Sequence, residues 1–254
     1  MVGGQTVLAI IPARGGSKSL PRKNVRVLRG HPLIAYSIFC ALDSATIDRA
    51  IVSTDDAEIA GVARTYGAEV PFLRPPELAL DLTPDLPVFE HALGWLSKHD
   101  GFKPDLVVHL RPTSPVRETT DVDGAVRLLA QRADVDSVRG VSLAPVTPFK
   151  MYRVGADGSL QSLLAGEDPI AHNAPRQSLP PCYRGNGAID VTRRLTITGP
   201  RSMTGATVLP WVLEGHCVDL DTPEDWDYLE WLVSTGSVRL PAAVHPRGAD
   251  HLDV

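Results

Sequence analysis

The chain has 254 residues, of which 43% are hydrophobic and 22% charged, and its formal net charge is −5. This length can bury a large core in one α/β domain, and the composition excludes an intrinsically disordered chain, a collagen and a coiled coil. No apolar run approaches the roughly 20 residues of a membrane-spanning helix, and the first residues lack a signal-peptide pattern. The three cysteines have neither disulfide-framework nor metal-ligand spacing. We therefore expect a cytoplasmic protein without a membrane partner.

Strands and helices alternate through the first half of the chain. Apolar runs predict strands at residues 6–11, 50–53, 69–72 and 106–110. Amphipathic or capped segments predict helices at residues 32–45, 57–66, 85–98 and 119–131. Such β-α repetition is typical of an α/β fold with a doubly wound, mostly parallel sheet and helices on both faces. In that architecture ligands bind at the carboxyl ends of the strands.

The pattern changes after residue 137. Strands are predicted at residues 137–143 and 151–154, followed by a hairpin turn at Asp157 and Gly158. Residues 165–184 contain four prolines and little periodicity, which indicates an irregular arm. Strands return at residues 187–191 and near 217–220, and Thr222 begins a final helix. We interpret residues 1–235 as one domain with an inserted arm at about 145–186, and residues 236–254 as a flexible tail.

Positive charge is concentrated at the start of the chain. Six basic residues and no acid precede Asp43, namely Arg14, Lys18, Arg22, Lys23, Arg26 and Arg29. One compact basic segment in an acidic protein is typical of a local anion site, although a solvated basic loop explains the charge equally well. The net negative charge argues against a nucleic-acid partner.

The basic segment includes a glycine-containing loop, residues 12–24, directly after the first predicted strand. Glycines let the backbone approach a ligand closely, and exposed backbone amides in such a loop bind anions. Arg14, Lys18 and Lys23 can then neutralise a polyphosphate. The spacing matches neither a P-loop nor a dinucleotide-binding fingerprint. Phosphate binding is favoured over a structural basic turn.

Several motifs together resemble one enzyme family. The first are IPARGGSK at residues 11–18 and LPRKN at residues 20–24. Further along are IVSTDD at 51–56, LRPPELA at 73–79, RPTSPVR at 111–117, PRQ at 175–177, NGAI at 186–189 and DLDT at 219–222. In this order they resemble the acylneuraminate cytidylyltransferases, which make CMP-activated sialic acids and related nonulosonates. The resemblance covers residues 7–231 and implies a Rossmann-like nucleotidyltransferase with a protruding dimerisation arm.

The resemblance implies transfer of CMP from CTP to the hydroxyl of an acidic keto-sugar, with release of pyrophosphate. Such a reaction depends mainly on positioning and charge neutralisation. The expected catalytic residues are Lys23, Arg14 and Asp219. The expected nucleotide-binding residues are Ala13, Arg14, Gly15, Lys18, Lys23, Asn24, Arg74 and Asp85. CTP, an acidic sugar acceptor and a second copy of the chain are the expected partners.

Asp219 and Asp221 are the candidate metal ligands. Residues i and i+2 of a strand share a face, so a strand at this point would direct both carboxylates to one cation. Hard oxygen ligands that share a cation with phosphates suit Mg²⁺ or Mn²⁺. The alternative is that Asp219 faces solvent and Asp221 only precedes the final helix.

The expected acceptor-binding residues are Arg111, Thr113, Ser114, Lys150, Arg176, Gln177, Arg184 and Asn186. An arginine pairs well with the carboxylate of a ulosonic acid. Alternatively, Thr113 and Ser114 are ordinary turn residues between prolines, and the arginines are surface residues.

Three features depart from the usual pattern of sialic acid enzymes. Arg111 stands where Gln is common, Asp190 where Tyr is common, and Asp85 begins a stretch that is usually rich in small hydroxyl residues. A guanidinium at Arg111 suits an additional anionic group on the acceptor, or else pairs with a nearby carboxylate and holds its loop. The eight histidines have no metal-ligand spacing, and we expect them at surface or capping positions.

The sequence thus predicts a cytidylyltransferase of acidic keto-sugars. Two alternatives stay open. One is nucleotidyl transfer to a different acidic acceptor such as a phosphonate, and the other is a non-catalytic nucleotide-binding regulator of the same fold. Lys23 and the Asp219 and Asp221 pair argue against the regulator, because binding alone does not need an aligned attack.

Overall fold

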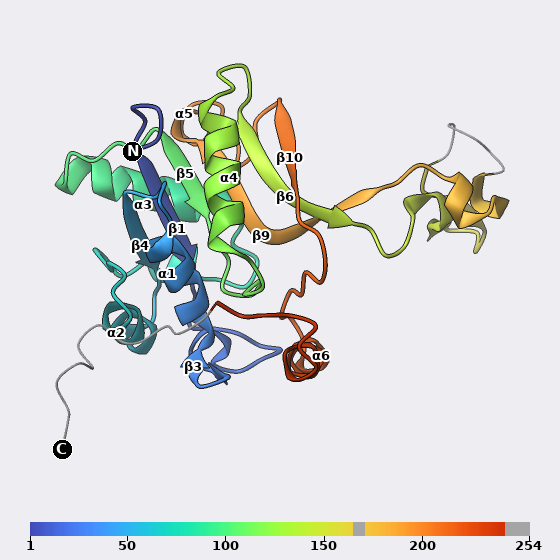
Figure 1. Cartoon of the computed structure of the whole chain (residues 1–254), viewed down its shortest axis with the longest axis horizontal. Coiled ribbons are helices and arrows are strands. Elements are labelled where there is room, and N and C mark those ends of the chain that lie inside the picture. The colour runs from blue at the N-terminus through green and yellow to red at the C-terminus, as the bar shows by residue number, and fades with distance from the viewer. Residues whose placement is uncertain (165–170, 242–254) are drawn as a thin grey trace.

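A six-stranded sheet forms the centre of the structure, a computed structural model that describes residues 1–164 and 171–241 (Figure 1). The strands lie in the order β10-β6-β9-β5-β1-β4. They are β1 (Val7–Pro12), β4 (Arg49–Ser53), β5 (Leu106–His109), β6 (Ser137–Leu143), β9 (Tyr183–Arg193) and β10 (Val208–Val212). β1 pairs in parallel with β4 and β5, and β10 with β6, whereas β9 is antiparallel to both neighbours. The predicted mostly parallel sheet is therefore confirmed.

Helices cover both faces of the sheet. One face packs against α1 (Leu33–Asp43), α2 (Ala57–Thr65) and α4 (Thr119–Ala130). The other packs against α3 (Asp85–His99) and α5 (Arg194–Thr198). In β1, Ala9 and Ile11 belong to the first core and Leu8 and Ile10 to the second, because successive side chains of a strand point to opposite faces. Each fully buried Leu or Ile stabilises the fold by about 1.5–3 kcal/mol. The doubly wound arrangement is confirmed.

A third apolar cluster joins the two ends of the domain. In it α6 (Pro223–Ser234) packs Trp226 and Leu229 against Leu20 and Leu28, near the short strands β2 (Val27–Leu28) and β3 (His31–Pro32). The predicted cap of this helix is present: Thr222 accepts a hydrogen bond from the Asp225 amide, and the Asp225 carboxylate accepts one from the Thr222 amide. The segment before α6 consequently lies beside the basic loop, residues 12–24.

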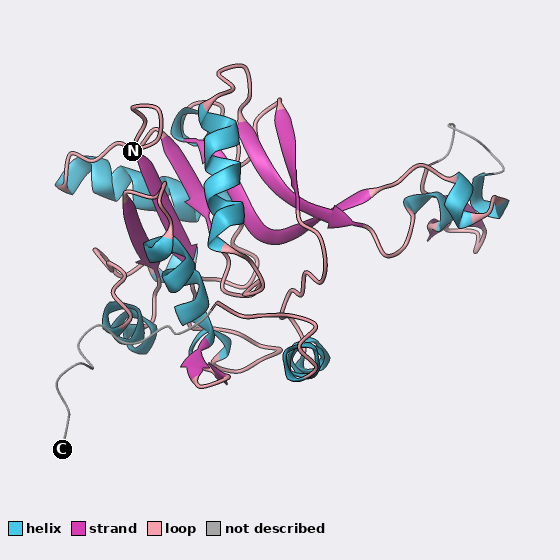
Figure 2. Cartoon of the chain, viewed as in Figure 1, coloured by secondary structure: helices cyan, strands magenta, loops and turns pink. Residues whose placement is uncertain are grey.

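An arm extends from the far end of β6 and β9 (Figures 1 and 2). It contains the hairpin β7 (Tyr152–Val154) and β8 (Leu160–Ser162) with three single-turn helices, η3 (Pro148–Lys150), η4 (Ala171–Asn173) and η5 (Arg176–Ser178). Every residue of β7 is exposed. The arm therefore presents its side chains away from the core of its own chain.

Several predicted elements differ from the observed ones. Residues 69–72 are not a strand, since only Glu69 forms an isolated bridge, to Ile51. Residues 217–220 are also not a strand. β9 begins earlier than predicted, and β10 and α5 were not predicted. Of the expected tail, residues 242–254 lie outside the described residues. Among residues 1–164 and 171–241, no helix is long and apolar enough to cross a membrane.

Candidate active site

A cavity of about 270 Å³ opens at the carboxyl ends of β1 and β5. This is the edge of the sheet at which a doubly wound fold presents ligand-binding residues. Eight residues predicted from the sequence line it: Arg14, Lys23, Asn24, Arg74, Asp85, Arg111, Thr113 and Asp221. They come from five separate parts of the chain, and the fold brings them together.

The basic loop supplies two exposed cations that share one carboxylate. Arg14 Nη1 lies 2.8 Å from Asp81 Oδ1, and the Lys18 ammonium also pairs with Asp81. Hydrogen bonds from Lys18 hold the pKa of Asp81 below its ordinary value despite some desolvation, and Arg14 adds to the effect. Asp81 was not identified from the sequence. It pairs with two of the three cations that we expected to bind a triphosphate.

Lys23 connects the basic loop to the segment before α6. Its ammonium donates a hydrogen bond of 2.7 Å to the Leu220 carbonyl and lies 3.1 Å from Asp221 Oδ1. Its side chain is only 13% exposed. Lys23 is therefore held at a defined point of the cavity, whereas Lys18 is 83% exposed.

Asn24 and Arg74 hold backbone segments at the cavity. Asn24 donates to the Arg14 carbonyl at 2.9 Å. Arg74 donates to the Ser53 hydroxyl at 3.1 Å and also to the Ser53 carbonyl. Burial lowers the pKa of the Arg74 guanidinium, which nonetheless stays a cation at physiological pH. Asn24 thus joins the two ends of the basic loop, and Arg74 ties the segment after α2 to the end of β4.

A glycine is required at position 15 because the backbone passes close to the Asp56 side chain. A Cβ at this position would lie 2.7 Å from Asp56 Oδ2 and 2.9 Å from Asp56 Cβ. Asp56 is itself fixed, because it caps α2 by accepting from the Ile59 amide at 3.0 Å. The Gly15 amide donates to Asp55, and the buried Ala13 donates its amide to the Ser53 carbonyl. The start of the basic loop is thus tied to the end of β4.

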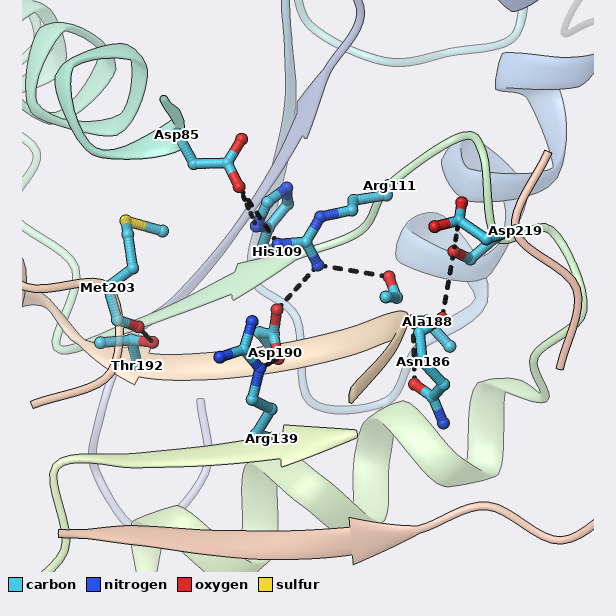
Figure 3. A network of polar contacts seen from close by, with 12 residues as sticks. Asp85, His109, Arg111, Arg139, Asn186, Ala188, Asp190, Thr192, Met203 and Asp219 are labelled. Atoms are coloured by element: carbon cyan, nitrogen blue, oxygen red, sulfur yellow. Dashed lines mark hydrogen bonds and ion pairs between the residues drawn. The ribbon is translucent and has the colours of Figure 1, made fainter. Parts of the chain in front are cut away.

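A charged network forms the opposite wall of the cavity (Figure 3). Arg111 Nη1 lies 2.7 Å from Asp190 Oδ2, and Arg111 Nη2 lies 3.1 Å from Asp85 Oδ2. Arg139 Nε lies 3.3 Å from the other Asp190 oxygen. Burial lowers the pKa of Arg111, but the two carboxylates outweigh burial and raise it overall. Two of the positions that depart from the usual pattern, Arg111 and Asp190, are therefore partners.

The turn after β5 carries Thr113 and Ser114. Thr113 lines the cavity, and its carbonyl accepts from the Leu220 amide at 2.8 Å. Ser114 is buried and donates weakly, at 3.4 Å, to Asp219 Oδ1. Gly187 allows this packing, since it has φ +71° and a Cβ there would lie 2.8 Å from Ser114 Oγ. The turn thus holds Asp219 near the cavity.

The strand geometry expected for the two candidate metal ligands is wrong. Asp219 and Asp221 lie in an irregular segment, which contacts the Thr113 carbonyl and the Lys23 ammonium instead of a neighbouring strand. Asp221 lines the cavity, and Asp219 contacts Ser114 behind it. Among the described residues, no group of three or more His, Cys, Asp and Glu side chains is arranged to hold a metal ion.

Five other predicted residues lie outside this cavity. Lys150 is in η3 of the arm, and Arg176 and Gln177 line a second cavity there, of about 440 Å³. Arg184 donates to the Cys217 carbonyl at 3.0 Å. The buried Asn186 donates to Ser142 and accepts from the Ala188 amide, which holds β9 in shape.

The expectation for the histidines is wrong at His109. This residue lies at the end of β5, is 2% exposed and lines the cavity. Its ring packs on Phe89, with 4.6 Å between the ring centroids. One sequence signal pointed to it, namely a polar residue at the end of an otherwise apolar strand.

Comparison with known proteins gives evidence about the family that does not depend on the geometry of the cavity. A family profile described as cytidylyltransferase matches residues 8–147. The chain is 34% identical to a CMP-N,N'-diacetyllegionaminic acid synthase of Legionella pneumophila, over 89% of this chain and 96% of that one. It is 32% identical to an N-acylneuraminate cytidylyltransferase of Escherichia coli, over 87% of this chain and 50% of that one.

Solved structures support the fold. A CMP:2-keto-3-deoxy-manno-octonic acid synthetase complexed with CTP is similar with a TM-score of 0.66 and 14% identity, over 91% of this chain and 99% of that one. A 4-diphosphocytidyl-2C-methyl-D-erythritol synthase from Anaerococcus prevotii is similar with a TM-score of 0.63 and 12% identity, over 92% and 98%.

Proposed function

The chain belongs to the cytidylyltransferase family, and we propose from this that it transfers CMP from CTP to the hydroxyl of a nonulosonic acid, releasing pyrophosphate. The full-length relationship to the Legionella pneumophila enzyme supports a nonulosonic acid as the acceptor. The observation that carries the proposal is the cavity itself, where a cationic loop faces a polar wall across the ends of β1 and β5. A nucleotide and a sugar would meet there.

In this mechanism the acceptor oxygen attacks the α-phosphorus of CTP. A bond forms between that oxygen and phosphorus while the hydroxyl proton passes to solvent water, the bond to the bridging oxygen of the β-phosphate breaks, and pyrophosphate leaves. Arg14 and Lys18 bind the triphosphate after it displaces Asp81. Lys23, held by Leu220 and Asp221, lies close to the charge that develops during transfer. Fixed cations of this kind stabilise the transition state more than the ground state.

A divalent cation, Mg²⁺ or Mn²⁺, completes the proposal. The donor chemistry fits at Asp221, whose carboxylate lines the cavity beside Lys23 of the basic loop, and Asp219, which contacts Ser114 behind the cavity, would supply the second hard oxygen donor. Two carboxylates leave further positions for phosphate oxygens and water. Such a cation would lower the pKa of the acceptor hydroxyl and neutralise phosphate charge.

The direct test is a pyrophosphate-release assay. The protein is incubated with Mg²⁺, each of the four nucleoside triphosphates, and a panel of N-acetylneuraminate, N,N'-diacetyllegionaminate, pseudaminate and 2-keto-3-deoxy-manno-octonate. We expect release only when CTP and a nonulosonic acid are both present. Binding of CTP without release for every acceptor would contradict the enzyme and favour a nucleotide-binding regulator.

The proposal includes a homodimer formed through the arm. The hairpin β7–β8 exposes apolar side chains that its own chain leaves uncovered, with Val154 73% and Leu160 67% exposed. Apolar patches of this kind are typical of protein interfaces. In a dimer, Lys150, Arg176 and Gln177 of the arm would serve the acceptor of the partner subunit. Light scattering should give twice the chain mass for the wild type, and the monomer mass for Val154→Glu combined with Leu160→Glu.

A further inference from the structure

The acceptor side of the cavity has a wall in which Asp85, His109 and Arg111 line the cavity and Asp190 pairs with Arg111. We call Asp85, His109, Arg111 and Asp190 the β5/β9 wall, because three of them come from β5, β9 and the residues directly after β5 (Figure 3). His109 and Asp190 are register partners across the two strands. Asp85 is the first residue of α3 and faces them.

The β5/β9 wall does not offer a free positive charge. Arg111 is paired with both carboxylates, and Arg139 supplies a second guanidinium to Asp190. Two guanidiniums and two carboxylates cancel. Of the four wall residues Asp85 is the most accessible, with its side chain 42% exposed against 23% for Arg111, whereas Arg139 is 45% exposed but does not line the cavity. An additional anionic group on the acceptor would therefore meet a carboxylate before it met a cation.

His109 is the one buried group of this wall whose hydrogen-bonding capacity is unused. Both ring nitrogens are buried and have no hydrogen-bond partner among the described residues. Nδ1 lies 3.9 Å from Asp85 Oδ2, which is too far for a hydrogen bond. Native proteins pair buried polar atoms, so an unpaired ring that lines a cavity points to a ligand.

The imidazole ring of His109 stays neutral in the folded chain. Burial and the charges of Arg111, Arg117 and Arg139 hold the pKa of His109 well below its ordinary value. A neutral imidazole has one N–H donor and one acceptor nitrogen. Since it resists protonation, it is poorly suited to remove the proton of the acceptor hydroxyl. It is well suited to hydrogen-bond an uncharged polar group.

The two ends of the wall face different substrates: Asp85 is one of the residues expected to bind the nucleotide, whereas Arg111 is expected to bind the acceptor. The residues expected to fix the nucleotide, Arg14 and Arg74, are anchored at the ends of β1 and β4. His109 and Asp190 lie on β5 and β9, on the other side of β1 in the strand order. The acceptor is the substrate that would occupy this side.

We propose that His109 forms a subsite for an uncharged hydroxyl or amide group of the acceptor sugar, with Arg111, held by Asp190, as its fixed backing. This inference rests on the proposed function and refines its substrate class. The subsite selects nonulosonic acids by neutral polar substituents, and a phosphorylated or doubly carboxylated acceptor gains nothing from it.

Three variants test the subsite in the pyrophosphate assay, with the acceptor from the panel that the wild type uses best. His109→Phe keeps an aromatic ring against Phe89 but removes both nitrogens. His109→Gln keeps one donor and one acceptor. His91→Phe is the matched control, because His91 also has a buried unpaired Nδ1 and packs on an aromatic ring, Phe72, yet is not among the residues that line the cavity.

We expect His109→Phe to raise the KM for the acceptor by about 5- to 20-fold while the KM for CTP changes less than about twofold. His109→Gln should recover most of the acceptor affinity, and His91→Phe should match the wild type. An unchanged acceptor KM in His109→Phe, or a rise in the KM for CTP instead, would overturn the subsite and leave the proposed function intact. Absence of turnover with every acceptor would overturn both.

Discussion

The two sides of the cavity differ in how far their charges are balanced. On the side of the basic loop, Arg14 and Lys18 are partly or fully exposed and share a single carboxylate, Asp81. On the side of the β5/β9 wall, Arg111 is mostly buried and each of its two arms has a carboxylate partner. The first side keeps an excess of positive charge that an anionic ligand can neutralise, whereas the second is neutral before any ligand arrives.

We infer from this difference that the loop side mainly determines binding strength and that the wall mainly determines selectivity. Exposed cations attract any polyphosphate, and their contribution is screened by salt. A buried, fully paired network has fixed geometry and rejects groups that cannot match it, since an unpaired buried charge is costly. We therefore expect changes on the loop side to alter catalysis and CTP affinity, and changes on the wall to alter stability and acceptor choice.

The largest effect is expected from Lys23→Ala, which removes the one well-buried cation of the loop side. Removal of a fixed charge that faces the transferring group typically costs about 100-fold in kcat. The measurement is steady-state kinetics with saturating CTP and acceptor, with circular dichroism to verify the fold. Lys98→Ala, on the exposed end of α3, is the matched control and should retain full activity. A wild-type kcat for Lys23→Ala would remove Lys23 from the mechanism.

The second prediction concerns stability on the wall side. Asp190→Asn leaves Arg111 with one carboxylate and Arg139 with none, and we expect a loss of about 2 kcal/mol in the free energy of unfolding. Breaking a buried pair costs about 3–5 kcal/mol, and this network is partly exposed to solvent, which reduces the cost. Urea unfolding of the wild type and the variant measures this loss in the free energy of unfolding. Asp134→Asn, which breaks an exposed pair with Arg132, should leave the urea midpoint unchanged. Equal midpoints for both variants would contradict the view that the wall is preorganised.

A third prediction uses the depressed pKa of His109. In the unfolded chain this histidine binds a proton below about pH 6.5, while the buried ring in the folded chain does not. The unfolded state then binds more protons, so stability is fully present above that pH and decreases as the pH falls. Between about pH 7.5 and pH 5.5 the wild type should lose about 1 kcal/mol that His109→Phe keeps. Parallel pH profiles for the two proteins would mean that His109 binds its proton over the same pH range in the folded and unfolded chains.

The smallest effect is expected from Asp81→Asn, which frees Arg14 and Lys18 for the triphosphate. Exposed ion pairs are weak, so the KM for CTP should fall only about two- to fivefold. The decrease should shrink at high salt, because screening weakens the competing pair as well. A higher KM in Asp81→Asn would indicate that Asp81 orders the loop for CTP instead of competing with it.

The sequence predicted those parts of the molecule that depend on local pattern. β1 and β5 read as buried strands because both faces are covered, and the caps of α2 and α6 were visible at Asp56 and Thr222. β10 was missed since it contains Pro210 and alternates between exposed and half-buried residues, both of which an edge strand tolerates. Residues 69–72 have strand composition but find only a single bridge to β4.

The pairing of the cavity residues could not be predicted in the same way. Arg111 contacts Asp85, 26 positions earlier, and Asp190, 79 positions later. Sequence reasoning noticed Arg111 and Asp190 separately as unusual residues, but only the register of β5, β9 and β6 brings them to one face. For the same reason, the sequence did not identify Asp81, since only the fold brings it to Arg14 and Lys18 of the basic loop.

One strand, β9, joins the arm to the β5/β9 wall. β9 starts at Tyr183, opposite Leu143 at the root of the arm, and carries Asp190 opposite His109 seven residues later, with an irregularity in its pairing to β6 between them. β9 is therefore one continuous strand from the root of the arm to the β5/β9 wall, and the irregularity in its pairing lies near Asn186 and Gly187 between the two. A molecule bound to the arm would thus be linked to the wall through a single strand.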